Sequence, residues 1–260
     1  MNRGSRRRSK LRTVIEVKDL WKKFRIPHEK RGTILEKVVG IFQILGGKTF
    51  SYEEFWALKG ISFSISQGES LGVIGENGSG KSTLLKLIAN IFRADKGSIK
   101  TSGKIAPILE LGVGFHPDLT VEENSLVYGS ILGLRNREVK ERMDSILKFS
   151  GLERFRDAKL KNLSSGMQIR LGFSVAIETD PDIFLIDEAI AVGDMEFQQK
   201  CISKFKDFKA QDKSIVLVSH DMDLVKQFCE KTLFLSKGEA VDFGETDRVI
   251  KKYTSRVKVQ

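Results

Sequence analysis

The sequence predicts an α/β fold in which a mostly parallel sheet is covered by helices on both faces. Two observations lead to this prediction. Apolar strand-like runs alternate with helical segments through most of the chain, and a glycine-rich loop at residues 75–82 joins an apolar strand to a helix. The chain has 260 residues, 40% hydrophobic and 30% charged, which is enough for one large globular domain with a buried core.

The elements before the glycine-rich loop are predicted to be strands. Alternating apolar and polar residues predict a strand at residues 13–17, and a strand region at 57–66 leads to the apolar strand at 71–74. Residues 28–56 form an insert, which either adds to a partner-binding surface or packs on its own sheet. Several apolar residues of the insert have the spacing of one helix face: Ile34, Leu35, Val38, Ile41, Phe42 and Leu45.

After the loop, helices and strands alternate, as in proteins with a parallel sheet. The largest feature is a mostly helical block at about 119–179, which is the candidate for a second subdomain. Patterning predicts further helices at 81–91, 196–210, 222–229 and 246–253, and strands near 98, 105–109, 183–186, 215–218, 233 and 240.

The formal net charge of +10 lies at the two ends of the chain. Residues 1–12 contain six basic residues and no acidic ones, and residues 251–260 contain four more basic residues. The body between them has 34 basic and 34 acidic residues, so a uniformly basic nucleic-acid-binding body is excluded. We interpret both ends as basic tails, which either contact anionic lipid or are solvated and disordered.

The cysteine content and the hydropathy pattern limit the compartment. Two cysteines, Cys201 and Cys229, make no disulfide framework, as is typical of a reducing environment. No segment approaches the roughly 18 apolar residues of a membrane-spanning helix, and the basic N-terminus lacks the apolar core of a signal peptide. We therefore expect a protein that stays in the cytoplasm and contacts a membrane only peripherally.

The loop at residues 75–82 matches the phosphate-binding pattern GxxxxGK[ST]. Its glycines allow backbone N–H groups to surround phosphate oxygens, and the helix that follows presents its positive end to the same anion. Lys81 supplies a charge for the β- and γ-phosphates, and Ser82 supplies a hydroxyl for Mg²⁺. The predicted nucleotide-binding residues are Gly75, Glu76, Asn77, Gly78, Ser79, Gly80, Lys81, Ser82 and Thr83.

A second motif combines an apolar strand with two carboxylates. Residues 183–186 are apolar and are followed directly by Asp187 and Glu188. The carboxyl end of a buried parallel strand is where ligands bind in such sheets. Asp187 is therefore predicted to hold Mg²⁺ through water, and Glu188 to deprotonate the water that attacks the nucleotide.

Three further motifs reveal a family. Residues 163–167 (LSSGM) resemble the LSGGQ signature of ATP-binding-cassette (ABC) ATPases, and Ser164 is placed to cap the helix that follows. Residues 191–194 are similar to the D-loop of that family, and His220 to its switch histidine. The resemblance spans about residues 13–250 and implies a P-loop NTPase core with a mostly parallel sheet, an antiparallel β subdomain and a helical subdomain at about 112–179.

The resemblance also implies a mechanism. Two copies pair head to tail, so that Ser164, Ser165 and Gly166 of one copy contact the γ-phosphate of the ATP bound to the other. His220 steadies that phosphate and the attacking water. ATP and Mg²⁺ are the implied cofactors, and Lys81, Glu188 and His220 the catalytic residues.

The chain departs from the family pattern at several positions. The signature lacks one glycine and the final glutamine, and Glu110 stands where a glutamine normally contacts Mg²⁺ and water. Phe24 matches the position of the aromatic residue that stacks on adenine, and Trp56 is a second candidate. Either ring is equally well explained as part of the core.

The combination of residues 110–124, the LSSGM signature, residues 187–201 and the insert resembles the Wzt-type ATPase subunits of bacterial polysaccharide exporters. That group serves the transport of O-antigen, capsule or teichoic acid. The resemblance implies a homodimer bound peripherally to the cytoplasmic face of the inner membrane, beneath a separate multi-spanning permease. Residues 112–120 are expected to face the permease.

Two other classes compete with this interpretation. A soluble ABC ATPase that acts on nucleic acid or ribosomes would use the basic tails to bind phosphates. Such proteins usually have two cassettes or a long coiled coil, and the chain shows neither feature, so we do not expect nucleic acid as a partner. A regulatory pseudo-ATPase is disfavoured because Lys81, Asp187, Glu188 and His220 are all present.

Overall fold

The computed structural model describes residues 12–27, 52–109, 111–187 and 194–257. Within these ranges the central element is a six-stranded sheet, and all of its neighbouring strands are parallel except the last pair. The prediction of a mostly parallel sheet is therefore confirmed. In sheet order the strands are β5 (Ile105–Ile108), β6 (Ile183–Asp187), β7 (Ser214–Val218), β3 (Leu71–Ile74), β8 (Lys231–Ser236) and β9 (Glu239–Glu245).

Both faces of this sheet are covered, because alternate residues of β3, β6, β7 and β8 enter two different cores. In β6, Phe184 and Ile186 belong to one core, and Ile183 and Leu185 to the other. Phenylalanine rings dominate the first core, where Phe184 stacks on Phe208 with ring centroids 4.2 Å apart. Helices α7 (Met195–Ala210), α8 (Met222–Phe228) and α9 (Thr246–Val257) supply this first core, and α2 (Lys81–Ile88) supplies the second.

A second sheet of three antiparallel strands packs on the α2 side, with the order β2 (Tyr52–Ser66), β1 (Thr13–Pro27) and β4 (Lys96–Thr101). The prediction that the first strand ends at residue 17 was wrong. Four basic residues between positions 18 and 25 hide the strand pattern, and two of them pair with acids: Lys22 with Asp95, and Lys23 with Glu54. Charged side chains on a strand are compatible with β structure when they pair across it.

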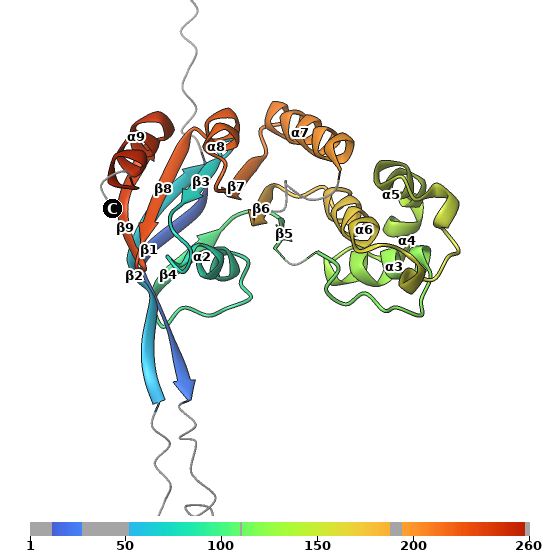
Figure 1. Cartoon of the computed structure of the whole chain (residues 1–260), viewed down its shortest axis with the longest axis horizontal. Coiled ribbons are helices and arrows are strands. Elements are labelled where there is room, and N and C mark those ends of the chain that lie inside the picture. Colours follow the sequence, from blue (N-terminus) through green and yellow to red (C-terminus); the bar gives the residue numbers. More distant parts are fainter. Residues whose placement is uncertain (1–11, 28–51, 110, 188–193, 258–260) are drawn as a thin grey trace, which may run out of the picture.

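The boundary of the predicted insert at 28–56 also needs correction. Residues 52–56 belong to β2 and pair with residues 23–27 of β1. Figure 1 shows the distal half of these two strands projecting beyond the rest of the molecule as a two-stranded ribbon. The helix pattern predicted from Ile34 to Leu45 lies outside the described residues.

A helical region with its own core lies at the right of Figure 1, inside the range predicted as helical. Its first helix begins with a capping box, in which Thr120 Oγ1 accepts from Glu123 N and the Glu123 carboxylate accepts from Thr120 N. The helices are α3 (Val121–Ile131), α4 (Asn136–Glu141), α5 (Met143–Ser150) and α6 (Ser165–Ile177), with 3₁₀ turns η1 (Glu153–Phe155) and η2 (Leu160–Asn162).

The predicted boundaries of both basic tails need correction. Helix α9 continues to Val257 because Val249 and Ile250 are buried and the Tyr253 ring packs on Phe234, so residues 251–257 are part of the folded body. Arg12 is also held, because its carbonyl oxygen accepts from Gln67 N at 2.8 Å. Residues 1–11 and 258–260 lie outside the described residues. Across the described ranges, no helix is long and apolar enough to cross a membrane.

Candidate nucleotide-binding site

Three neighbouring strands end at the same level of the central sheet. Val73 of β3 pairs with Val218 of β7, and Val218 pairs with Asp187 of β6. Strands lie about 4.8 Å apart, so Asp187 is about 10 Å from Val73 across this row. The phosphate loop after β3, Asp187 and His220 after β7 therefore share one edge of the sheet, as predicted for a ligand-binding edge.

The phosphate loop is clamped between strands at one end and open in its middle. An alanine Cβ at Gly75 would lie 2.1 Å from the Leu235 carbonyl oxygen, so the loop leaves β3 in direct contact with β8. Gly78 has a left-handed φ of 76° and no atom within 4 Å of the corresponding position. Ser79 anchors the loop, because its carbonyl oxygen accepts from Gly238 N at 3.1 Å.

Lys81 begins helix α2 and is 7% exposed. Its Nζ donates to the Gly75 carbonyl oxygen at 2.8 Å and to the Glu76 carbonyl oxygen at 2.9 Å. The ammonium group is thus held against the loop itself, next to the positive end of a helix. A cation and helix N–H groups at one glycine-rich loop form a binding site for an anion such as phosphate.

The acidic strand end and the histidine are positioned by different means. Asp187 is half-buried as the last residue of β6. His220 is exposed and lies in a turn in which Ser219 Oγ accepts from Asp221 N at 3.0 Å, while the Asp221 carboxylate caps α8. The predicted residues Glu110 and Glu188 lie outside the described residues.

The signature residues lie at the N-terminus of α6. Ser164 is the N-cap, and its Oγ accepts from Met167 N at 3.3 Å, as the sequence predicted. Ser164 and Ser165 are exposed, and a side chain at Gly166 would meet no atom within 4 Å. Figure 1 shows α6 and α2 well apart, so one copy of the chain does not bring the signature to its own phosphate loop.

The two candidate adenine-stacking rings lie on different faces of the β1–β2 ribbon. Trp56 contacts the edge of Trp21 with centroids 5.4 Å apart, and the ammonium groups of Lys23 and Lys96 lie 5.6 and 5.7 Å from its ring. Phe24 belongs to the opposite face, where its ring meets Phe92 at 5.6 Å. The Lys22 ammonium lies 5.4 Å from the Phe24 ring centroid, so both rings have a cation contact and such contacts do not distinguish the two candidates.

A groove lies between the segment after β5 and helix α6, with a cavity volume of about 280 Å³. Tyr128 fixes the segment, because its ring packs on Phe115 at 5.3 Å and its hydroxyl bonds to the Gly112 backbone. Burial raises the pKa of Tyr128 to about 12, so the hydroxyl stays protonated. The lining residues are Leu111, Gly112, Phe115, Pro117, Leu160, Ser165, Gln168 and Ile169.

Half of this lining was missed by the sequence analysis. The prediction for residues 112–120 covered Gly112, Phe115 and Pro117, whereas Leu160, Gln168 and Ile169 come from a distant part of the sequence. The spacing of apolar residues in α6 indicates which face of the helix is buried, but it does not indicate which loop crosses the opposite face. Within the part of the chain that the structure describes, the local signal is a pair of exposed apolar side chains, Val113 and Ile131, on and over the segment after β5.

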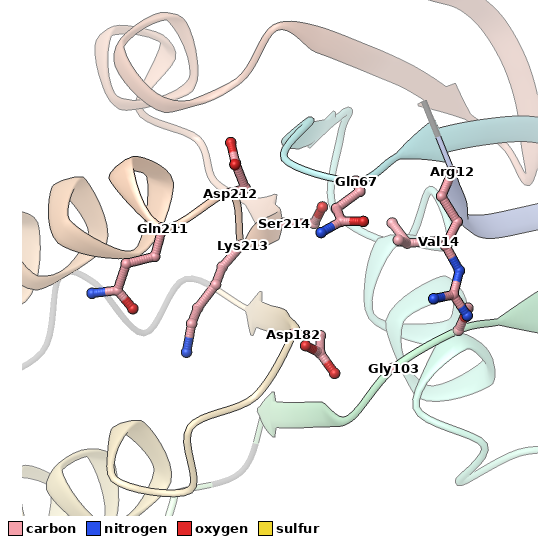
Figure 2. Close-up of a pocket in the computed structure, with 10 residues that line it drawn as sticks. Arg12, Val14, Gln67, Gly103, Asp182, Gln211, Asp212, Lys213 and Ser214 are labelled. Carbon is pink, nitrogen blue, oxygen red and sulfur yellow. The ribbon is translucent and has the colours of Figure 1, made fainter. Parts of the chain in front are cut away.

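Figure 2 shows a different hollow, of about 190 Å³, which contains none of the predicted site residues. It lies where β6 and β7 begin, so it is at the opposite end of the strands from the phosphate loop. Arg12 crosses it to donate to Ser102 Oγ at 2.6 Å, and Asp182 on its wall accepts from Lys104 N at 2.7 Å. The first bond joins the ends of β1 and β4 in the antiparallel sheet, and the second joins the starts of β5 and β6 in the central sheet, so both have a structural role.

Comparison with known proteins identifies relatives along most of the chain. Residues 58–191 match a family model described as ABC transporter. The O-antigen export system ATP-binding protein RfbB of Klebsiella pneumoniae is 42% identical over 212 residues, which cover 82% of this chain and 84% of that protein. The teichoic acids export ATP-binding protein TagH of Enterococcus faecalis is 39% identical over 221 residues, covering 85% and 48% respectively.

Solved structures share the fold. A post-hydrolysis dimer of the ATP-binding cassette MJ0796, bound to ADP and Pi, superposes with a TM-score of 0.69 at 24% identity. The match covers 89% of this chain and 98% of that one. A structure described as the ATP-binding subunit of an ABC transporter gives a TM-score of 0.70, also at 24% identity, and covers 93% and 94%. The sheet and helix order described above is therefore that of a known cassette fold.

Proposed function

This chain belongs to the ABC transporter family, and we propose that its ATPase activity powers export of a lipid-linked polysaccharide through a separate permease. The substrate class is O-antigen, capsular polysaccharide or teichoic acid. The similarity to ATP-binding proteins of export systems extends over most of the chain and carries this proposal. These relatives do not favour the alternative, an ABC ATPase that acts on nucleic acid or ribosomes.

We infer that ATP binds with its β- and γ-phosphates in the loop of residues 75–82. Backbone N–H groups of the loop surround the phosphate oxygens, and the open position at Gly78 leaves room for them. Lys81 exchanges its bonds to the loop carbonyls for bonds to phosphate. Thr83, in the first turn of α2, completes the proposed phosphate-binding set, and Phe24 is the proposed contact of the adenine.

Mg²⁺ fits the oxygen atoms that this edge of the sheet presents. The described residues contain no group of three or more His, Cys, Asp or Glu side chains that would hold a metal alone. Mg²⁺ usually takes one or two protein oxygens and completes its shell with phosphate and water. The proposed ligands are Ser82, Asp187 and Glu110. When bound, the ion neutralises charge on the β- and γ-phosphate oxygens.

Glu188 is the proposed general base. In the sequence it directly follows Asp187, and Asp187 ends β6 on the edge that also presents the phosphate loop and His220. A carboxylate in this position accepts the proton of the water that attacks the γ-phosphate. His220, in its turn at the end of β7, holds the γ-phosphate and that water in line. Lys81 stabilises the charge that develops on the phosphate oxygens.

A second copy of the chain completes the site in this proposal. The exposed N-terminus of α6 carries Ser164, Ser165 and Gly166, and Figure 1 shows α6 well apart from α2, the helix that follows the phosphate loop. Head-to-tail pairing brings this helix end to the γ-phosphate held by the other copy, where its N–H groups favour an anion. ATP then joins the two copies, and hydrolysis releases them.

We further propose that the groove beside α6 receives a segment of the permease, which keeps the ATPase on the cytoplasmic face of the membrane. Two exposed apolar side chains belong to the wall made by the segment after β5: Val113 lies between the lining residues Gly112 and Phe115 in the sequence, and Ile131, with 56% exposure, packs over Gly114. Such an apolar rim is typical of a protein-binding surface. One wall of the groove is α6, so binding there acts directly on the helix that carries the signature.

Copurification from solubilised membranes tests this proposal. The wild-type chain should recover a multi-spanning membrane protein, and Ile131→Asp should lose it. Phe155→Asp is the matched control, because Phe155 is a 40% exposed apolar residue of the same helical region that lies in turn η1, and not in the segment after β5 or in helix α3, which packs on that segment through Ile131. Recovery of ribosomes or nucleic acid without a membrane protein would contradict the export proposal.

A further inference from the structure

Phe55 lies on the same face of the β1–β2 ribbon as Phe24. The two residues are direct cross-strand partners, and Lys23 and Trp56 form the next pair. Directly opposed residues of antiparallel strands point to the same side, and successive pairs alternate. One face therefore carries Phe24 and Phe55, and the other carries Trp56. Phe55 is 50% exposed.

This face is the one that borders the phosphate loop. Lys22, two residues before Phe24, pairs with Leu58. A Leu58 methyl group lies 2.7 Å from the position that an alanine Cβ would take at Gly80, the last glycine of the loop. The Phe24 ring contacts Phe92, which follows helix α2. The Lys22–Leu58 and Phe24–Phe55 pairs thus lie on one face of the ribbon, with a one-residue shift in the register of β2 between them.

The spacing along β2 matches the shape of a nucleotide. The Phe24–Phe55 and Lys22–Leu58 pairs are two residues apart along β1, because the register of β2 shifts by one residue between them, and a strand rises about 3.3 Å per residue. Phe55 therefore lies about 7 Å along the ribbon from the contact with the loop. A ribose and one phosphate separate the base of ATP from its β- and γ-phosphates. With these phosphates in the loop, an extended nucleotide therefore places its base over the Phe24–Phe55 pair.

We propose that Phe55 is a second base-binding residue, which forms with Phe24 a two-ring platform for the adenine. The proposal rests on the binding of ATP in the phosphate loop, given above. Stacking on an aromatic ring needs no hydrogen bond to the base, so the platform favours purines through their larger ring area rather than through their base edges. It also explains an exposed phenylalanine beside a charged ribbon, because the ring is covered when nucleotide binds.

Calorimetry with two ligands separates the platform from the phosphate site. Mg–ADP contacts both, and Mg–pyrophosphate contacts the phosphate loop alone. Phe55→Ala should weaken Mg–ADP binding at least five-fold, as expected for a lost base–aromatic stack, and leave Mg–pyrophosphate binding unchanged. Phe55→Trp should retain the wild-type affinity for Mg–ADP.

Tyr52→Ala is the matched control, because Tyr52 is a 53% exposed aromatic residue of the same strand on the Trp56 face. Its affinity for Mg–ADP should equal that of the wild type. If wild type binds Mg–ADP and Phe55→Ala binds it as tightly, the platform is refuted and the phosphate site stands. An equal loss of Mg–pyrophosphate binding in Phe55→Ala also refutes it. If wild type binds neither ligand, the phosphate site and the platform fail together.

Discussion

Replacing Gly75 with alanine should destabilise the fold, whereas replacing Gly78 should chiefly weaken nucleotide binding. Both glycines have positive φ angles, 150° and 76°, and an alanine in such a conformation costs about 1–3 kcal/mol. At Gly75 the new methyl group would also lie 2.1 Å from the Leu235 carbonyl oxygen of strand β8. Overpacking of this kind adds about 1–3 kcal/mol. The expected loss is therefore about 2–6 kcal/mol for Gly75→Ala.

Urea unfolding followed by the fluorescence of Trp21 and Trp56 measures this difference. Gly78→Ala should lose only the stability that the positive φ angle costs an alanine, because no atom lies within 4 Å of its new methyl group. Its affinity for Mg–ADP should still fall about ten-fold or more, since the methyl group occupies space proposed for phosphate and a lost charge-assisted bond costs about 1.5–3 kcal/mol. Equal stability of the two variants would refute the steric argument. Wild-type affinity in Gly78→Ala would refute the placement of the phosphates.

Two further substitutions test the site and the helical region. Lys81→Ala should weaken Mg–ADP binding about 10- to 100-fold in calorimetry, because it removes a hydrogen bond to a charged group worth about 1.5–3 kcal/mol; unchanged affinity would contradict the proposed role of Lys81. Glu122→Gln tests a pH dependence: the hydrogen bond and charge of Arg156, 2.5 Å away, hold the pKa of Glu122 below its usual value. The stabilisation is therefore present above the unfolded pKa of about 4.3 and lost as the pH falls through the folded pKa. The difference in Tm between wild type and Glu122→Gln should be larger at pH 7 than at pH 3, and a constant difference would contradict this.

The parts of the site that the sequence predicts are those in which neighbouring residues act together. The phosphate loop is a continuous segment whose glycines, lysine and serine must follow one another, and Asp187 directly follows the apolar strand that positions it. The helix that begins at the signature is predictable for the same reason, because the Ser164 side chain caps it by accepting from the backbone N–H of Met167, three residues later. Local chemistry determines these features, so a single sequence is enough to find them.

The parts that sequence analysis misses depend on contacts between distant residues. The extension of β1 to Pro27 requires the partner strand beginning at Tyr52, and basic residues conceal its pattern. The face on which Phe55 lies follows only from its register with Phe24. Helix α9 continues past residue 253 because the Tyr253 ring packs on Phe234 of strand β8. In the sequence alone, the basic residues of this segment suggest a solvated tail.

The central claim is that the chain hydrolyses ATP with Glu188 as general base in a two-copy sandwich. Glu188→Gln removes the base and keeps a side chain of the same size, so ATP binding should persist without turnover. Light scattering after size-exclusion chromatography, combined with phosphate release, measures both consequences in one sample. The account predicts no phosphate release by Glu188→Gln and a dimer that forms only with ATP. Undiminished hydrolysis, or a monomer in saturating ATP, would contradict it.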